Sequence, residues 1–185
     1  MLDTRHPGHH LAQFNVGLLR APLESPELAD FVALLDPINA LAEESPGFVW
    51  RLQTEEGDAT SVRPYGDMVI VNLSVWESGR ALWDFAYASR HLDVVRRRRE
   101  WFERMAEPYL VLWWVGAGHV PTVAEAMHRL DLLRHEGPSP SAFTFRRFLP
   151  PSCGAFTGRA SGGSARGSPR PAGTYPATGH RARPR

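Results

Sequence analysis

Residues 68–76 read Met68-Val-Ile-Val-Asn-Leu-Ser-Val-Trp76, a run dense in Val and Ile that predicts a β-strand. Because successive side chains of a strand point to opposite faces of its sheet, the run divides into two sets. One face carries Val69, Val71, Leu73 and Val75, and the other carries Met68, Ile70, Asn72, Ser74 and Trp76. We expect the valine face to lie beneath the helices.

Further elements are indicated on both sides of this strand. Ser25-Pro26-Glu27 starts a first helix, Ser78 caps a second that breaks near Ser89-Arg90, and a third follows Thr122. Further strands are expected at His10–Leu19, Phe48–Gln53 and Tyr109–Val115, and 142–147 is either a short strand or an extended arm. The order βαββαβ predicts an α+β fold of ferredoxin-like type, with an antiparallel sheet and an extra C-terminal helix.

The composition changes at Pro150. Residues 10–149 are expected to form the domain and 1–9 an N-terminal arm, while the Gly/Pro/Arg-rich tail 150–185 lacks the large aliphatic residues needed to offset ordering and is predicted to be disordered. All 20 acidic residues precede Pro150, and six arginines follow it. A weakly acidic domain argues against nucleic acid as its ligand, although the basic tail could contact nucleic acid or acidic surfaces.

The expected location is the cytoplasm. The single cysteine excludes an internal disulfide, no apolar run reaches the length of a membrane span, and the polar N-terminus has no signal-peptide core. We therefore expect a protein that has no membrane contact.

Several motifs resemble those of a bacterial family of domains of unknown function within the dimeric α/β-barrel superfamily. They are His10-Leu-Ala-Gln-Phe-Asn15, Leu35-Asp-Pro-Ile-Asn39, Ser45-Pro-Gly-Phe-Val-Trp50, Val75-Trp-Glu-Ser78, Arg96-Arg-Arg-Arg-Glu-Trp101 and Pro108-Tyr-Leu-Val-Leu-Trp-Trp114. The resemblance implies a homodimer packed sheet against sheet, in a superfamily that includes cofactor-independent monooxygenases, haem-degrading monooxygenases and small isomerases. It supplies no substrate, and fold alone does not give function.

Polar side chains recur on one face of three expected strands. If these faces coincide, Gln13, Asn15, Arg51, Gln53, Asn72 and Ser74 cluster together. Buried amides need hydrogen-bond partners, which a small-molecule ligand, a dimer partner or solvent could supply. The cluster therefore predicts either a ligand site or a polar interface.

The resemblance and this cluster together favour a monooxygenase or a related tailoring enzyme that acts on an aromatic small molecule without a cofactor or metal. Donors for an oxyanion and aromatic walls are the groups such a site needs. The catalytic candidates are Asn15, Asn72 and Arg51, and the substrate-binding candidates are Gln13, Trp50, Ser74, Trp76, His91, Trp113 and Trp114. Tryptophans in a compact domain are more often core residues than ligand contacts. The alternative function is a non-catalytic small-molecule-binding or structural dimer.

A haem protein is a weaker alternative. Asn15 suits the asparagine of haem-degrading relatives, but Phe85 and Val95 or Arg96 fall where those relatives carry tryptophan and histidine. His91 comes about one helical turn too early and is also explained as a surface or helix-break residue. The run Arg96–Arg99 is either a solvated helix face or an anion clamp at a pocket rim.

Overall fold

The computed structural model describes residues 5–151. Its elements in chain order are β1 (His9–Leu18), the short 3-10 helix η1 (Pro26–Leu28), α1 (Ala29–Glu44), β2 (Phe48–Arg51), β3 (Val69–Trp76), α2 (Gly79–Ala88), α3 (His91–Trp101), β4 (Leu110–Gly116) and α4 (Val123–Glu136). The predicted disorder of the tail concerns residues that lie, beyond Pro151, outside this described part.

The four strands form one antiparallel sheet in the order β2-β3-β1-β4. This is the strand order of the ferredoxin-like fold, so the prediction of an α+β domain with an additional C-terminal helix is confirmed. The register places Gln13 opposite Ser74 and Asn15 opposite Asn72. The amides of β1 and β3 therefore share one face of the sheet.

The helix caps and the helix break lie where the sequence predicts them. The Ser78 and Thr122 side chains accept hydrogen bonds from the Ala81 and Glu125 backbone N–H groups and so cap α2 and α4. The expected break separates α2, which ends at Ala88, from α3, which begins at His91. Pro37 does not break its helix, because α1 continues through it to Glu44.

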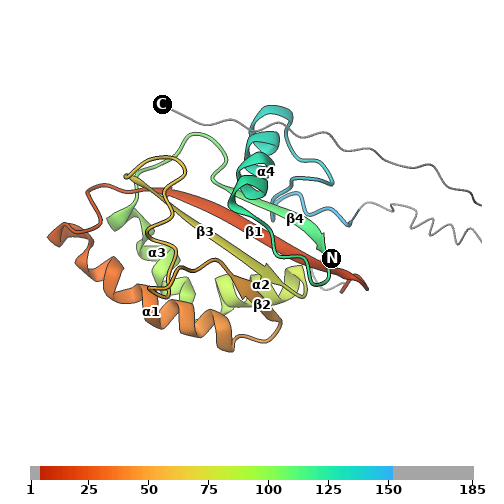
Figure 1. The fold of residues 1–185 in the computed structure, drawn as a ribbon, viewed down its shortest axis with the longest axis horizontal. Helices are drawn as coiled ribbons and strands as arrows, with labels where there is room; N and C mark the ends of the chain where they lie inside the picture. The colour runs from red at the N-terminus through yellow and green to blue at the C-terminus, as the bar shows by residue number, and fades with distance from the viewer. Residues whose placement is uncertain (1–4, 152–185) are drawn as a thin grey trace, which may run out of the picture. The chain divides into compact units, whose positions relative to one another are not determined.

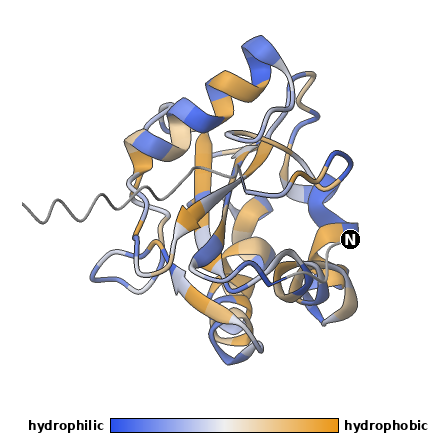
Figure 2. Ribbon diagram, turned by 90° about the vertical axis from the view of Figure 1, so that its right-hand side faces the viewer, coloured by the Kyte–Doolittle hydropathy of each residue, from blue (hydrophilic) through white to orange (hydrophobic). Residues whose placement is uncertain are grey.

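The sheet is covered on both faces, with α1, α2 and α3 on one side and α4 on the other (Figure 1). Figure 2 shows hydrophobic strand segments between the two helical layers. The valine face packs against α4, where Val71, Leu73 and Val75 join Ala126 and Leu130 in one core cluster and are at most 5% exposed. The expectation that this face lies beneath the main helices is wrong, because α1, α2 and α3 cover the amide face instead.

The amide face has apolar packing only towards its two ends. Leu11 and Trp76 pack with α2 at one end, and Leu19 packs with Leu28 and Trp101 at the other. Between these clusters the sheet presents Gln13 and Asn15, against which apolar helix residues cannot pack closely without stranding buried polar groups. A space therefore stays open between the middle of the sheet and its helices.

The segment after α4 is an extended arm and not a regular strand. Phe143 exchanges two backbone hydrogen bonds of 2.8 Å with Leu112 of β4, forming an isolated bridge. Phe148 then packs edge-on against Trp114, with ring centroids 5.8 Å apart. No helix within residues 5–151 has both the length and the apolar character required to span a bilayer.

Candidate functional site

A cavity of about 280 Å³ lies between the amide face and α1, α2 and α3. Its walls include residues of all four strands, of these three helices, of the loop after β2 and of the C-terminal arm. Its size is close to the lower end of the usual range for small-molecule pockets. Seven of the predicted site residues line it: Gln13, Asn15, Arg51, Asn72, Ser74, Trp76 and His91.

Three predicted substrate-binding tryptophans lie outside the cavity lining. Trp50 packs with the valine-face core, and Trp113 is buried in that core with its indole Nε1 donating to the Glu125 carboxylate at 3.0 Å. Trp114 donates from Nε1 to the Leu149 carbonyl oxygen at 2.8 Å. These contacts give all three structural roles, as in the alternative that assigned them to the core.

A chain of hydrogen bonds, here called the amide relay, crosses the cavity floor through Trp76, Ser74, Gln13 and Asn15. Trp76 Nε1 donates to Ser74 Oγ at 3.0 Å, and Ser74 Oγ donates to Gln13 Oε1 at 3.0 Å. Gln13 Nε2 then donates to Asn15 Oδ1 at 2.7 Å. The first three residues are nearly or fully buried, and Asn15 is partly exposed.

The chemistry of the relay fixes its direction. An indole N–H can only donate, so the Ser74 hydroxyl accepts a hydrogen bond from Trp76. Its own O–H group then donates a hydrogen bond to the side-chain oxygen of Gln13. The Gln13 amide must then present its NH₂ group to the oxygen of Asn15. Asn15 is left with Nδ2, which has no hydrogen-bond partner within residues 5–151. The relay therefore ends in two N–H donors available to an acceptor in the cavity.

The other two catalytic candidates, Arg51 and Asn72, differ in whether their side chains already have a partner within the protein. Arg51 has a side chain only 13% exposed, and its guanidinium pairs with the Glu43 carboxylate at 2.8 Å. Its charge is thus balanced within the protein. Asn72 lies beside Asn15 on β3, is exposed and lines the cavity. It can contact a ligand, but no hydrogen bond from residues 5–151 holds its amide in one orientation.

His91 is a cavity residue and not a surface residue. It stands at the start of α3, and its ring stacks on Phe85 with centroids 4.6 Å apart. Phe85 in turn stacks on Trp76 at 5.0 Å. All three line the cavity, so this part of its wall is aromatic.

The contacts of His91 also define its protonation. Its Nδ1 lies 3.3 Å from the Ala86 carbonyl oxygen, which can only accept, so Nδ1 carries the proton. Burial lowers the pKa of the His91 imidazole below its usual value of 6.5, while the Ala86 carbonyl opposes the shift. His91 is therefore neutral at pH 7, and its Nε2 carries an unshared electron pair that can accept a proton.

Two tyrosines and one arginine occupy the wall formed by α2, α3 and β4. The Arg98 guanidinium lies 4.3 Å from the centre of the Tyr109 ring and donates from Nη1 to the Tyr109 hydroxyl. Burial raises the pKa of the Tyr87 phenol, with a further contribution from Tyr109 that Arg98 partly offsets. Tyr87 is therefore a neutral hydroxyl at physiological pH.

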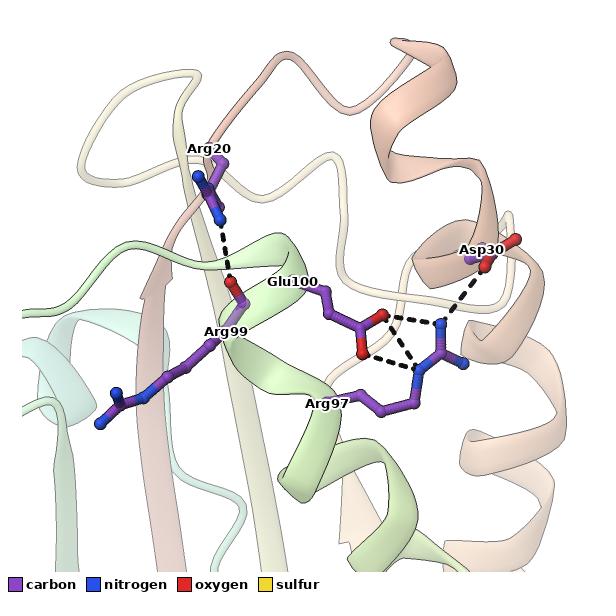
Figure 3. Close-up of polar contacts among 5 residues, drawn as sticks. All are labelled: Arg20, Asp30, Arg97, Arg99 and Glu100. Atoms are coloured by element: carbon purple, nitrogen blue, oxygen red, sulfur yellow. Dashed lines mark hydrogen bonds and ion pairs between the residues drawn. The ribbon is translucent and has the colours of Figure 1, made fainter.

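Of the remaining arginines of the basic run, Arg97 links α3 to another helix by its side chain. Arg97 pairs with Glu100 on its own helix at 2.8 Å and with Asp30 of α1 at 3.3 Å (Figure 3). Arg20 donates to the Arg99 carbonyl oxygen at 3.1 Å. Arg96 pairs with Asp93 in the first turn of α3. Of the four arginines, only Arg98 lines the cavity.

Sequence reasoning did not select Tyr87, Tyr109 or Asn39, which also line the cavity. A signal for Asn39 was present, because it belongs to a family-like motif on the amphipathic first helix. The tyrosines carried no distinguishing pattern. Within residues 5–151, no group of three or more His, Cys, Asp or Glu side chains is arranged to hold a metal ion.

Comparison with known proteins places the chain in a family. Among solved structures it is similar to NE2512, a protein of unknown function from Nitrosomonas europaea (14% identity, TM-score 0.39, 63% of this chain and 99% of that one). It is also similar to Rv0793 from Mycobacterium tuberculosis (15%, 0.39, 61% and 99%) and to SnoaB, a cofactor-independent oxygenase from Streptomyces nogalater (16%, 0.37, 61% and 96%). No curated protein matches it. Residues 10–157 match the model of the domain of unknown function DUF3291, and the chain therefore belongs to the DUF3291 family.

Proposed function

We propose that the cavity binds a small aromatic phenol and that the protein oxygenates this phenol with dioxygen, without a cofactor. The observation that carries the proposal is the pairing, in one cavity, of a fixed donor group at Asn15 with a neutral imidazole at His91. A phenol that reacts directly with dioxygen must first lose its proton. The cavity offers a group for the proton and a group for the resulting oxyanion.

The two groups divide this task. His91 Nε2 would accept the phenol proton, because burial lowers the pKa of the imidazole and keeps it neutral and able to take up a proton. The Asn15 N–H donors would stabilise the phenolate, and the relay behind them keeps them oriented towards the cavity. Trp76, Phe85 and His91 would give the ring an apolar wall and limit access of water.

The proposed reaction is balanced without another reductant or oxidant. The phenolate transfers four electrons in total to one molecule of dioxygen. One oxygen atom forms a new carbonyl para to the original oxygen, and the other leaves as water with the former para hydrogen and the phenol proton. The product is a quinone.

The test substrate is naphthalene-1,5-diol, an electron-rich phenol with a free para position, incubated with the purified chain under ¹⁸O₂. The expected product is 5-hydroxy-1,4-naphthoquinone carrying one ¹⁸O atom, formed faster than in buffer alone. His91→Asn keeps a donor for the Ala86 carbonyl but lacks Nε2, and should lower kcat by about 10²–10⁴-fold. Equal rates with and without the protein would refute the oxygenase proposal.

A matched pair of variants isolates the role of Asn15. Asn15→Asp keeps the shape and the oxygen that accepts from Gln13, but replaces the two donors with a carboxylate oxygen. Asn39→Asp introduces the same charge elsewhere on the cavity lining. We expect the first to abolish turnover and the second to retain most of it. Equal losses would indicate a general charge effect and not a specific oxyanion site.

Non-catalytic binding is the rival function, and the same test compound and Asn15 variant distinguish it from the oxygenase. A binding protein would take up naphthalene-1,5-diol in an Asn15-dependent manner without forming quinone.

The predicted homodimer stays a separate prediction. In a dimer packed sheet against sheet, the second copy would meet the face opposite α1, α2 and α3, and this face carries Val71, Leu73 and Val75, which α4 already buries. A dimer would therefore use another surface, and its existence is tested by light scattering.

A further inference from the structure

We infer that the aromatic ligand carries a carboxylate and that Arg98 is the residue that recognises it. This inference rests on the proposed function, because it names the substrate class for the same cavity. Arg51, Arg98 and Asp58 line it, together with the neutral His91.

Two of these charges are already engaged by the protein. Arg51 pairs with Glu43 at 2.8 Å. The Asp58 carboxylate accepts a hydrogen bond of 2.6 Å from the Thr60 backbone N–H, within the loop that follows β2. Arg51 therefore has its counter-charge within the protein, and the Asp58 carboxylate is held within its own loop.

Arg98 differs because it has no carboxylate partner within residues 5–151. Arg51, the other arginine that lines the cavity, has one, and so do Arg96 and Arg97 of the same helix. Within residues 5–151, the contacts of Arg98 are with the ring and the hydroxyl of Tyr109, which supply no carboxylate, and its side chain is partly buried. A partly desolvated guanidinium without a counter-charge is a site for an anion.

The position of Arg98 is set before a ligand arrives. The Tyr109 ring supports the guanidinium plane at 4.3 Å, and the Arg97–Asp30 pair ties α3 to α1. A fixed guanidinium loses little freedom when it binds, which favours a planar carboxylate matched to its parallel N–H groups. A single unpaired arginine balances one negative charge, so a monoanionic carboxylate fits better than a phosphate dianion.

The experiment compares 1-hydroxy-2-naphthoate with 1-naphthol, which differ only in the carboxylate. Binding to the full chain is measured by isothermal titration calorimetry at pH 7.5. We expect the naphthoate to bind about 10- to 100-fold more tightly, as a charge-assisted pair with arginine allows. Arg98→Gln should remove this preference and leave the affinity for 1-naphthol nearly unchanged.

Arg99→Gln is the control, because it removes the same charge from the next residue of α3, whose side chain is exposed and outside the cavity lining. It should keep the preference. If 1-naphthol binds in an Asn15-dependent manner but the naphthoate binds no better, or if Arg98→Gln keeps the preference, the inference about Arg98 is overturned while the phenol site stands. If neither compound binds, the proposed phenol site itself fails, and the inference with it.

Discussion

Removal of the Ser74 hydroxyl is the sharpest test of the amide relay. In Ser74→Ala, Trp76 Nε1 loses its acceptor and Gln13 Oε1 loses its donor, and the two residues are 0% and 6% exposed. Each stranded buried group costs roughly 1–3 kcal/mol. We therefore expect the free energy of unfolding to fall by about 2–4 kcal/mol, a large share of the 5–15 kcal/mol typical of a domain.

Urea unfolding followed by far-ultraviolet circular dichroism measures this change without relying on the fluorescence of Trp76. With m of about 1–3 kcal/mol per molar urea, the midpoint should fall by roughly 1–2 M. The same variant should bind 1-naphthol more weakly, because the Gln13 amide can then rotate and no longer holds Asn15 in one orientation. Ser78→Ala removes another buried hydroxyl, at the start of α2, and should leave binding unchanged.

A double-variant cycle separates loss of the relay from loss of packing. Gln13→Leu removes the acceptor of the Ser74 hydroxyl, and Ser74→Ala removes the donor. In the combined variant neither group remains to be stranded by the other, so the total cost should be smaller than the sum by about 1–2 kcal/mol. Costs that add to within about 0.5 kcal/mol would show that Ser74 and Gln13 act independently, and the relay argument would fail.

Two further predictions concern backbone strain and proton uptake. Gly47 has φ +81°, and a Cβ there would lie 2.7 Å from Ala81 Cβ, whereas Gly57 has φ +91° and open space around it. Gly47→Ala should therefore lower the free energy of unfolding by clearly more than the roughly 1–2 kcal/mol expected for Gly57→Ala. Equal losses of stability in urea unfolding would contradict this. Because the folded state lowers the pKa of His91, the unfolded chain binds its proton more readily, and stability should fall as pH drops below 6.5. His91→Phe should reduce this acid sensitivity, and an unchanged pH profile would argue against a buried neutral imidazole.

The fold was predictable because its signals are local. Each signal depends on residues that are close together in the sequence: strand alternation, the caps at Ser78 and Thr122, and the break near Ser89. The structure agrees with each of them. The covering of the two faces was not predictable in this way. Both faces of β3 are covered by helices. The alternation of residues in a strand shows that the strand has two different faces, but it does not show which helix packs on each face.

The candidate site was predictable in its polar floor and less so in its walls. Gln13, Asn15 and Ser74 sit on paired strands, where alternation alone brings amides together. Trp113 failed as a cavity residue because it alternates onto the opposite face of β4. His91 reaches the cavity because the turn between α2 and α3 directs its ring onto Phe85, and the geometry of such a turn is not encoded in residue type.

The position of α4 has a consequence for how the cavity works. In a ferredoxin-like sheet left bare on one face, the strands would depend on a second copy for burial, and a ligand site on the other face would be coupled to association. Here α4 supplies that burial within one chain, through Ala126, Leu130 and Leu133. The amide relay is therefore supported from behind by an apolar core that is formed within one chain. Substitutions in the relay should for this reason change ligand binding at every protein concentration alike.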